Sequence, residues 1–295
     1  MGVSKLIKNR IKSVGNARNI TKAMELVAAA KIKRAVNNLM SSRTYAQHAR
    51  ELLANLAKER NLKHPLLSTP KSKKELLIII ASNRGLCGSY NTNVIKASVE
   101  YIKANKGTEI DVIAIGKKAE DIFPQTKNKV IASFLKLPDD LYTDDILPIS
   151  KMAIEEFTKQ NYRKISIAFT NFISSLKYDA KVSSLLPITK ENLAEILTEE
   201  ISSAELKKAQ ATTLFEPDEE KVLDMVLPRL TEVRIYQAIL EANASEHSAR
   251  MIAMKNATDN AKEIVEELTL YYNQARQAGI TQEIAEISGA IEALT

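Results

Sequence analysis

The chain has 295 residues, of which 45% are hydrophobic and 5% aromatic, and its formal net charge is +6. The hydrophobic fraction excludes a disordered chain, and the single cysteine, Cys87, excludes an intramolecular disulfide or a cysteine-based zinc site. The scarcity of aromatic side chains argues against one large globular core and favours narrow seams between helices.

Residues 1–64 are predicted to form one long helix, because Gly15 is the only helix breaker between residues 3 and 64. Ser4 is the predicted N-cap, and Pro65 ends the helix. The segment carries 14 Lys and Arg residues against three Glu residues, which suits an acidic protein surface, nucleic acid or an anionic membrane. Its predicted seam, at steps of three, four or seven, consists of Ile7, Ile11, Val14, Thr21, Met24, Val27 and Lys31.

Residues 221–295 are predicted to form a second long helix, since residues 229–278 contain neither Gly nor Pro. One predicted stripe consists of Ile264, Leu268, Tyr271, Ala275 and Ala278, and a second of Ile280, Ile284, Ile287, Ile291 and Leu294. The end of this helix is therefore apolar on more than one side and needs cover from another molecule. We expect the two long helices to pair antiparallel as a coiled coil, because the chain returns through a compact middle domain.

The middle of the chain alternates predicted strands with predicted helices. Apolar runs at 76–81, 110–115, 164–170 and, more weakly, 182–186 predict strands, and the stretches near 91–104, 117–123 and 146–160 predict helices. Alternation of this kind with nearly continuous apolar strands indicates a Rossmann-like α/β domain, placed at residues 75–205. Residues 65–74 and 206–220 are the predicted linkers, so the fold class is α/β plus a long helical coiled coil.

No segment of the sequence predicts a catalytic centre, a cofactor site or a metal site. Gly85 and Gly88 lie in the turn 82–91 after the first strand, but the phosphate-binding glycine patterns are absent, so a tight strand-to-helix turn is the better interpretation. Cys87 is expected to be buried and inert, because the middle domain has no His to act as its base. The acidic residues Asp139, Asp140, Asp144 and Asp145 match no calcium loop and predict a solvated loop.

Three segments resemble the gamma subunit of the F-type ATP synthase. They are IleThrLysAlaMetGluLeuValAlaAlaAlaLysIleLysArgAla (20–35), SerAsnArgGlyLeuCysGly (82–88) and TyrTyrAsnGlnAlaArgGlnAlaGlyIleThrGlnGluIleAlaGluIleSerGlyAla (271–290). The two terminal segments are long and specific, whereas the middle one is weak alone and has Asn83 where that family commonly has Asp. The resemblance covers the start, middle and end of the chain.

The resemblance implies a non-catalytic rotor shaft that couples ion-driven rotation of the c-ring to conformational cycling of the catalytic ring. The implied partners are three alpha and three beta subunits, the epsilon and delta subunits and the c-ring, with membrane contact only through the c-ring and no nucleic acid. The implied location is the cytoplasmic side of a bacterial inner membrane. The positions that match the family's contacts with the alpha and beta ring are Lys22, Met24, Lys31, Lys33, Arg34, Arg276, Gln277, Thr281, Ile284, Ile287 and Ile291.

Two other functions are compatible with the sequence. The basic N-terminal segment is also typical of a coiled-coil protein that binds nucleic acid or acts as a scaffold, which would bind duplex DNA with an affinity that falls steeply with salt. The α/β domain is also compatible with a small-molecule enzyme, although the sequence offers no catalytic residues for it.

Overall fold

The computed structural model describes residues 2–56, 64–122, 128–138, 141–188 and 219–292. The chain divides into two compact units, one formed by residues 1–30 and 250–295 and the other by residues 31–249. Two helices contribute to both units: α1 (Gly2–Leu56) and α6 (Glu219–Glu292).

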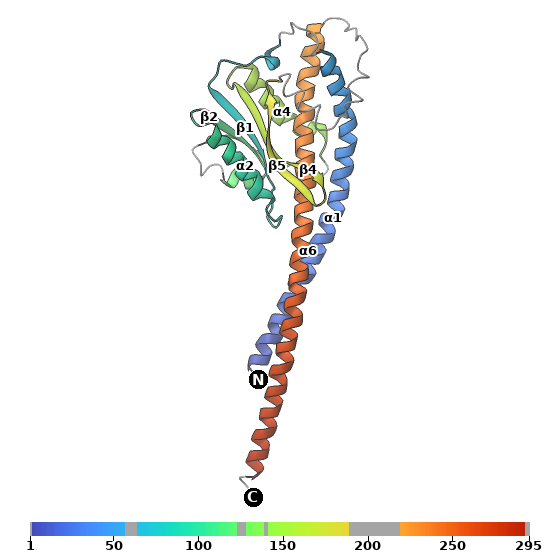
Figure 1. The fold of residues 1–295 in the computed structure, drawn as a ribbon, viewed down its shortest axis with the longest axis vertical. Helices are drawn as coiled ribbons and strands as arrows, with labels where there is room; N and C mark the ends of the chain where they lie inside the picture. The colour runs from blue at the N-terminus through green and yellow to red at the C-terminus, as the bar shows by residue number, and fades with distance from the viewer. Residues whose placement is uncertain (1, 57–63, 123–127, 139–140, 189–218, 293–295) are drawn as a thin grey trace. The chain divides into compact units, whose positions relative to one another are not determined.

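The first unit is a pair of antiparallel helices, formed by the start of α1 and the end of α6 (Figure 1). Thr258 Oγ1 donates a hydrogen bond of 2.8 Å to Thr21 Oγ1 across the pair. Most of the less exposed positions fall at alternating steps of three and four along both helices, as in a coiled coil, and Gly15 and Met24 are half-buried beside them. The seam positions are Ser4, Ile7, Ile11, Val14, Arg18, Thr21, Glu25 and Ala28 in α1 and Thr258, Ala261, Val265, Leu268, Tyr272, Ala275 and Gly279 in α6.

The predicted coiled coil is confirmed, but several of its predicted seam residues are wrong. Val27 is 56% exposed, whereas its neighbour Ala28 is 2% exposed, because strict steps of four and three from Ile7 lead to Glu25 and Ala28 rather than to Met24 and Val27. Arg18 occupies one of these seam positions but is exposed.

In α6 the predicted Leu268 and Ala275 do lie in the seam, whereas Ala278 is exposed and Gly279 takes its place. Ile264 and Tyr271 are exposed, and Val265 and Tyr272 replace them in the seam. Ser4 is also not the N-cap, because α1 begins at Gly2 and Ser4 lies inside the helix.

The second unit contains a five-stranded sheet in the order β3-β2-β1-β4-β5. Its strands are β1 (Lys74–Ile80), β2 (Glu109–Ile115), β3 (Val130–Phe134), β4 (Lys164–Ser174) and β5 (Lys177–Leu186). All neighbouring strands are parallel except β4 and β5, which form an antiparallel pair. The central strands are buried on both faces, which explains why their sequences are apolar without alternation.

Helices cover both faces of this sheet (Figure 1). Leu77 and Ile79 of β1 face α2 (Tyr90–Ala104) and α3 (Lys117–Ile122). Leu76, Ile78 and Ile80 face the opposite way, into a core shared with α4 (Thr143–Thr158) and with the parts of α1 and α6 that belong to this unit. Alternate residues of one strand thus hold two helical layers against the sheet.

The predicted α/β domain and its strand–helix alternation are confirmed. Strand β3 was not predicted, because Val130–Phe134 is short and lies at an edge where most of its residues are only half-buried. Helix α6 continues through Pro228, and the short 3₁₀ helix η1 (Pro65–Leu67) begins at the proline predicted to stop the first helix. Most of the predicted linker 206–220 lies outside the described residues.

Candidate partner-binding surface

The glycine-containing turn after β1 is held by its own side chains. Asn91 Oδ1 accepts a hydrogen bond of 3.0 Å from Ser82 N, and the Asn91 amide donates to Ser82 Oγ at 2.8 Å. Asn83 Oδ1 accepts from Lys117 N at 3.1 Å, which ties this turn to the start of α3. The N–H groups of Ser82 and Lys117 thus both donate to asparagine side chains of the protein.

Sequence reasoning missed the role of Asn91, which closes this turn. One feature of the sequence indicates this role. Asn91 has an amide side chain and lies in the first turn of the helix that follows β1, after a connection of nine residues. Cys87 lies in this same turn and is buried as predicted, with its Sγ accepting from the Asn91 amide at 3.1 Å.

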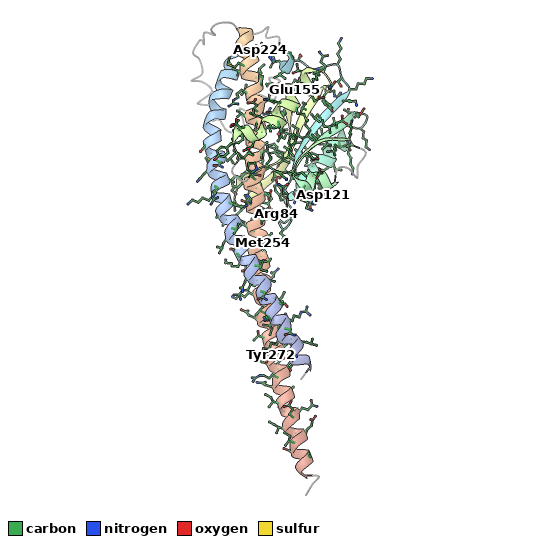
Figure 2. All side chains as sticks on the ribbon, turned by 180° about the vertical axis from the view of Figure 1, so that it is seen from behind. Arg84, Asp121, Glu155, Asp224, Met254 and Tyr272 are labelled. Atoms are coloured by element: carbon green, nitrogen blue, oxygen red, sulfur yellow. The ribbon has the colours of Figure 1, made fainter. Side chains whose placement is uncertain are left out.

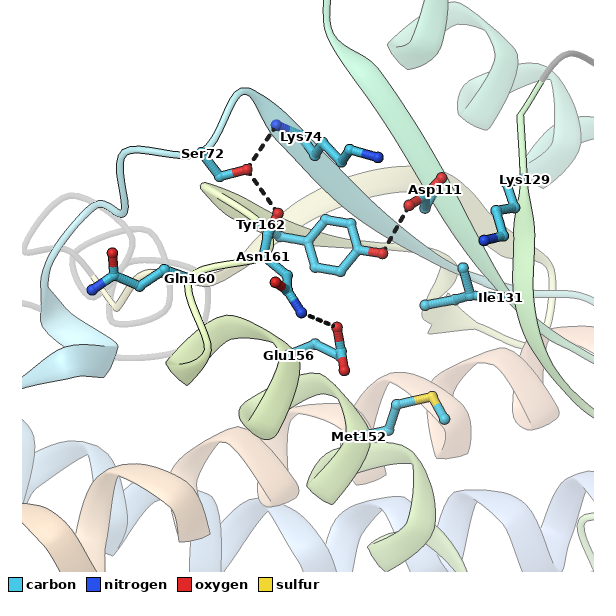
Figure 3. Close-up of a pocket in the computed structure, with 10 residues that line it drawn as sticks. All are labelled: Ser72, Lys74, Asp111, Lys129, Ile131, Met152, Glu156, Gln160, Asn161 and Tyr162. Carbon is cyan, nitrogen blue, oxygen red and sulfur yellow. Dashed lines mark hydrogen bonds between the residues drawn. The ribbon is translucent and has the colours of Figure 1, made fainter.

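An open polar cavity of about 630 Å³ lies at the opposite edge of the sheet, where the parallel strands begin (Figure 3). The Tyr162 hydroxyl donates to Asp111 Oδ2 at 2.8 Å, and the Asn161 amide donates to Glu156 Oε2 at 2.7 Å. Lys74 pairs with Glu109 at 2.5 Å at this edge. The remaining lining residues are Ser72, Lys129, Ile131, Met152 and Gln160.

A hydrogen bond between two buried side chains, Tyr162 and Asp111, holds one wall of this cavity. Burial and the neighbouring Asp111 carboxylate raise the pKa of Tyr162 well above its usual range, so the hydroxyl stays protonated and keeps its bond to Asp111. Ligands of open parallel sheets bind at the carboxyl ends of the strands, and this cavity lies at the amino ends. Among the described residues, no cluster of His, Cys, Asp and Glu has the arrangement of a metal site.

Two residues of the predicted acidic loop belong to a helix instead. Asp144 and Asp145 lie in the first turn of α4, where negative charge is favourable, and Asp145 Oδ2 accepts a hydrogen bond of 2.8 Å from Tyr142 N. Asp139 and Asp140 lie outside the described residues.

The predicted contact residues of α1 differ in exposure. Lys22 is half-exposed and its Nζ pairs with Glu25 Oε1 at 3.0 Å in the same helix, and Met24 is half-buried. In the other unit, Lys31 is half-buried, whereas Lys33 and Arg34 are exposed and available to a partner.

The predicted contact residues near the end of α6 are exposed along the helix. Arg276 and Gln277 are exposed, and Thr281 Oγ1 donates to the Gln277 carbonyl at 3.0 Å, which places Gln277 and Thr281 on one face. Ile284 and Ile287 are 59% and 62% exposed, and the side chain of Ile291 lies outside the described residues.

The end of α6 is left unpaired by α1. Gly2 lies nineteen residues before Thr21, and the position nineteen residues after Thr258 is Gln277, so α1 begins opposite about that position. Every residue from 281 to 290 is exposed (Figure 2 shows these side chains projecting outward). Ile284 and Ile287 are therefore apolar side chains that the described part of this chain leaves in contact with solvent. None of the described helices combines the length and the hydropathy needed to cross a membrane.

Taken together, the described residues define a class of protein that combines a long antiparallel helix pair, the end of which is exposed, with a mixed α/β domain. Comparison with known proteins supports this class. Residues 4–294 match the family described as ATP synthase.

Close relatives extend over the whole chain. The ATP synthase gamma chain of Herpetosiphon aurantiacus is 40% identical, over 100% of this chain and 99% of that protein. The gamma chain of Ralstonia nicotianae is 37% identical over the full length of both. The chain therefore belongs to the ATP synthase gamma chain family, and its function is that of an ATP synthase gamma subunit.

Two solved structures share the fold. A chain of the Euglena gracilis mitochondrial ATP synthase rotor matches with a TM-score of 0.66 and 19% identity, over 95% of this chain and 99% of that one. A chain of the Tetrahymena thermophila mitochondrial ATP synthase central stalk and c-ring matches with a TM-score of 0.57 and 23% identity, over 81% of this chain and 99% of that one.

Proposed function

We propose that this gamma subunit is the central rotor shaft of its ATP synthase. Rotation of the c-ring, driven by ion flow, turns the shaft, and the shaft in turn drives the three catalytic beta subunits through states of different nucleotide affinity. A shaft can shift these states only by contacting them differently in each orientation. The synthase makes ATP in one direction of rotation and hydrolyses it in the other.

The observation that carries this proposal is the bare end of α6. Its residues 281–290 extend past the beginning of α1, all of them exposed, and include Ile284 and Ile287. Apolar side chains at such a helix end have an unfavourable free energy of contact with water. A partner that encloses the helix end removes this contact. An apolar collar inside a ring of alpha and beta subunits is such a partner.

The contacts with the ring are proposed at two places. Lys22, Lys33 and Arg34 face acidic surfaces of the beta subunits, where each exposed pair contributes only about 0–1 kcal/mol. Near the end of α6, Arg276, Gln277 and Thr281 form polar contacts with a beta loop. Weak and numerous contacts suit a shaft that must slip past three equivalent neighbours.

The chain itself is proposed to be non-catalytic. In the turn after β1, the Asn91 side chain accepts a hydrogen bond from the Ser82 N–H. The cavity beside Tyr162 lies at the amino ends of the parallel strands, whereas ligands of such sheets bind at the carboxyl ends. Neither place supports nucleotide chemistry. The resemblance to bacterial gamma subunits supports the epsilon and delta subunits and the c-ring as further partners. It also supports a peripheral location on the cytoplasmic side of the inner membrane.

Deletion of the residues after Gly279 tests the proposal in the purified complex. We expect the full-length chain to co-purify with three copies each of alpha and beta, and the truncated chain to remain folded but to lose most ATP synthesis or to assemble poorly. Subunit stoichiometry by mass spectrometry and ATP synthesis in vesicles are the measurements. Full ATP synthesis by the truncated complex would show that the bare end is not a required contact. Failure of the full-length chain to co-purify would contradict the shaft role altogether.

A further inference from the structure

One histidine makes two hydrogen bonds where η1 meets the beginning of α6. His64 Nδ1 accepts a hydrogen bond of 3.0 Å from Leu66 N and so caps the amino end of η1. The other ring nitrogen, Nε2, lies 3.2 Å from Oδ1 of Asp224, near the beginning of α6 (Figure 2), and donates to it. The ring therefore carries one proton, on Nε2, and uses Nδ1 as an acceptor.

These contacts hold η1 between α6 and the end of β5. Leu66 is 1% exposed, and its carbonyl accepts a hydrogen bond of 2.8 Å from Ile188 N, which follows β5. Leu67 N donates to the His64 carbonyl at 3.0 Å and closes the short helix. His64 thus connects η1, and through it the end of β5, to α6. We call the contacts of His64 with Leu66 and Asp224 the histidine latch.

A second proton on the ring is incompatible with the histidine latch. Once Nδ1 is protonated it carries a hydrogen and can no longer accept from Leu66 N. Only 10% of the His64 side chain is exposed, and this burial lowers the pKa of His64 below its usual 6.5 although the Asp224 carboxylate acts in the opposite direction. The Asp224 side chain is 72% exposed, and an exposed carboxylate stabilises a charged ring only weakly.

The other elements around the ring add no charge to it. Among the described residues, Asp224 is the charged group that acts on the pKa of His64. The residues of η1 are Pro65, Leu66 and Leu67, and no described acidic or basic side chain of α4, which also packs against η1, changes this pKa. The response of the histidine latch to pH is therefore set by the ring, its cap and Asp224.

We propose that the histidine latch is a switch that acid releases. The neutral ring joins η1 to α6, and protonation of Nδ1 frees the Leu66 amide and loosens the joint between α6 and the end of β5. Since the folded state binds the second proton less tightly than the unfolded state, the stabilisation is complete above pH 6.5 and is lost as the pH falls through the lowered pKa. The switch is a property of this chain alone and does not depend on the proposed shaft role.

Hydrogen exchange of the full-length chain tests the switch. The protection of residues 64–68, corrected for the intrinsic effect of pH on exchange, is compared at pH 7.5 and pH 5.0, with β1 as the reference. We expect roughly a tenfold loss of protection at 64–68 in acid and little change in β1. His64→Asn should abolish this loss, because asparagine caps a helix through its side-chain oxygen and does not titrate in this range. The matched control is His247→Asn, a half-buried histidine of α6, which should retain the loss.

Asp224→Asn gives a second readout at an exposed position, where the fold is retained. The amide oxygen still accepts from Nε2, but the missing charge no longer favours a protonated ring, so the loss of protection should begin at a lower pH. A wild-type chain whose protection at 64–68 is the same at both pH values would overturn the proposal. So would an equal loss in His64→Asn, or a loss that begins at a higher pH in Asp224→Asn.

Discussion

At the scale of single residues, the α/β domain depends on a backbone contact that only glycine permits. Gly116 follows β2 with φ of +88°, and its N–H donates a hydrogen bond of 3.0 Å to the Phe134 carbonyl. A Cβ at this position would lie 2.0 Å from the Ala81 carbonyl oxygen. The sequence shows a glycine after an apolar run. It does not show that the backbone at the end of the neighbouring strand β1 passes so close to this glycine.

Gly116→Ala is therefore expected to lower the free energy of unfolding by roughly 3 kcal/mol or more, because both the backbone conformation and the contact must change. Urea denaturation followed by circular dichroism measures this. Gly85→Ala is the control, since nothing lies within 4 Å of a Cβ there. A similar effect of the two substitutions would show that the Ala81 contact has no part in stability.

A half-buried tyrosine makes the α/β domain sensitive to alkaline pH. Burial, with the Glu75 carboxylate beside it, raises the pKa of Tyr101 to about 12 from 10.0. Its hydroxyl donates to Glu75 Oε2 at 2.9 Å and lies 3.0 Å from Ser166 Oγ, and Arg163 pairs with Glu75 at 2.6 Å. Since the folded state holds this proton more tightly, its stabilisation is complete below pH 10 and is lost as the pH rises through 12.

Tyr101→Phe should reduce the decline in unfolding free energy between pH 10 and pH 12, and should also lower stability at neutral pH through the lost hydrogen bonds. Denaturation curves at pH 10 and pH 12, recorded for the wild type and for the variant, give the slope of the decline for each protein. Tyr162 and Tyr236 also have raised pKa values, so the variant retains part of the decline. An unchanged slope would mean that Tyr101 does not titrate with folding.

At the scale of elements, the sequence predicts the existence of the long helices better than it predicts their faces. The scarcity of Gly and Pro is sufficient to predict both long helices, although α1 contains Gly15 and α6 continues through Pro228 and two glycines. The predicted seam is wrong at Val27 because the true seam includes Glu25. A search for apolar residues does not select a charged residue such as Glu25. Glu25 is tolerated there because Lys22 pairs with it. Small seam residues such as Ala28 and Ala261 were equally hard to recognise, since alanine is common on every face of a helix.

Ala28→Asp tests the observed seam directly. A carboxylate at this buried position is expected to destabilise the helix pair by about 3 kcal/mol, whereas Ala29→Asp, one residue further and exposed, should have little effect. Thermal denaturation monitored at a helical wavelength measures the difference. If Ala29→Asp were the more damaging substitution, the seam would lie one residue further along α1.

At the scale of the whole molecule, the terminal segments that resemble gamma subunits led to the family, and relatives about 40% identical over the full length confirm it. The contact residues are less accessible to sequence reasoning, because exposed lysines and isoleucines do not reveal which side of a helix pair they share. That information comes from the register between α1 and α6, which the Thr21–Thr258 hydrogen bond marks.

Rotation of the chain within its complex is the most direct test of the shaft role. An exposed cysteine in place of Lys106 can be labelled selectively, because the native Cys87 is buried, and can carry a bead while the alpha and beta ring is fixed to a surface. We predict that ATP makes the bead turn in one direction with three equal steps per revolution, one for each beta subunit. A bead that stays still in ATP, on a complex that hydrolyses it at the full rate, would contradict the account.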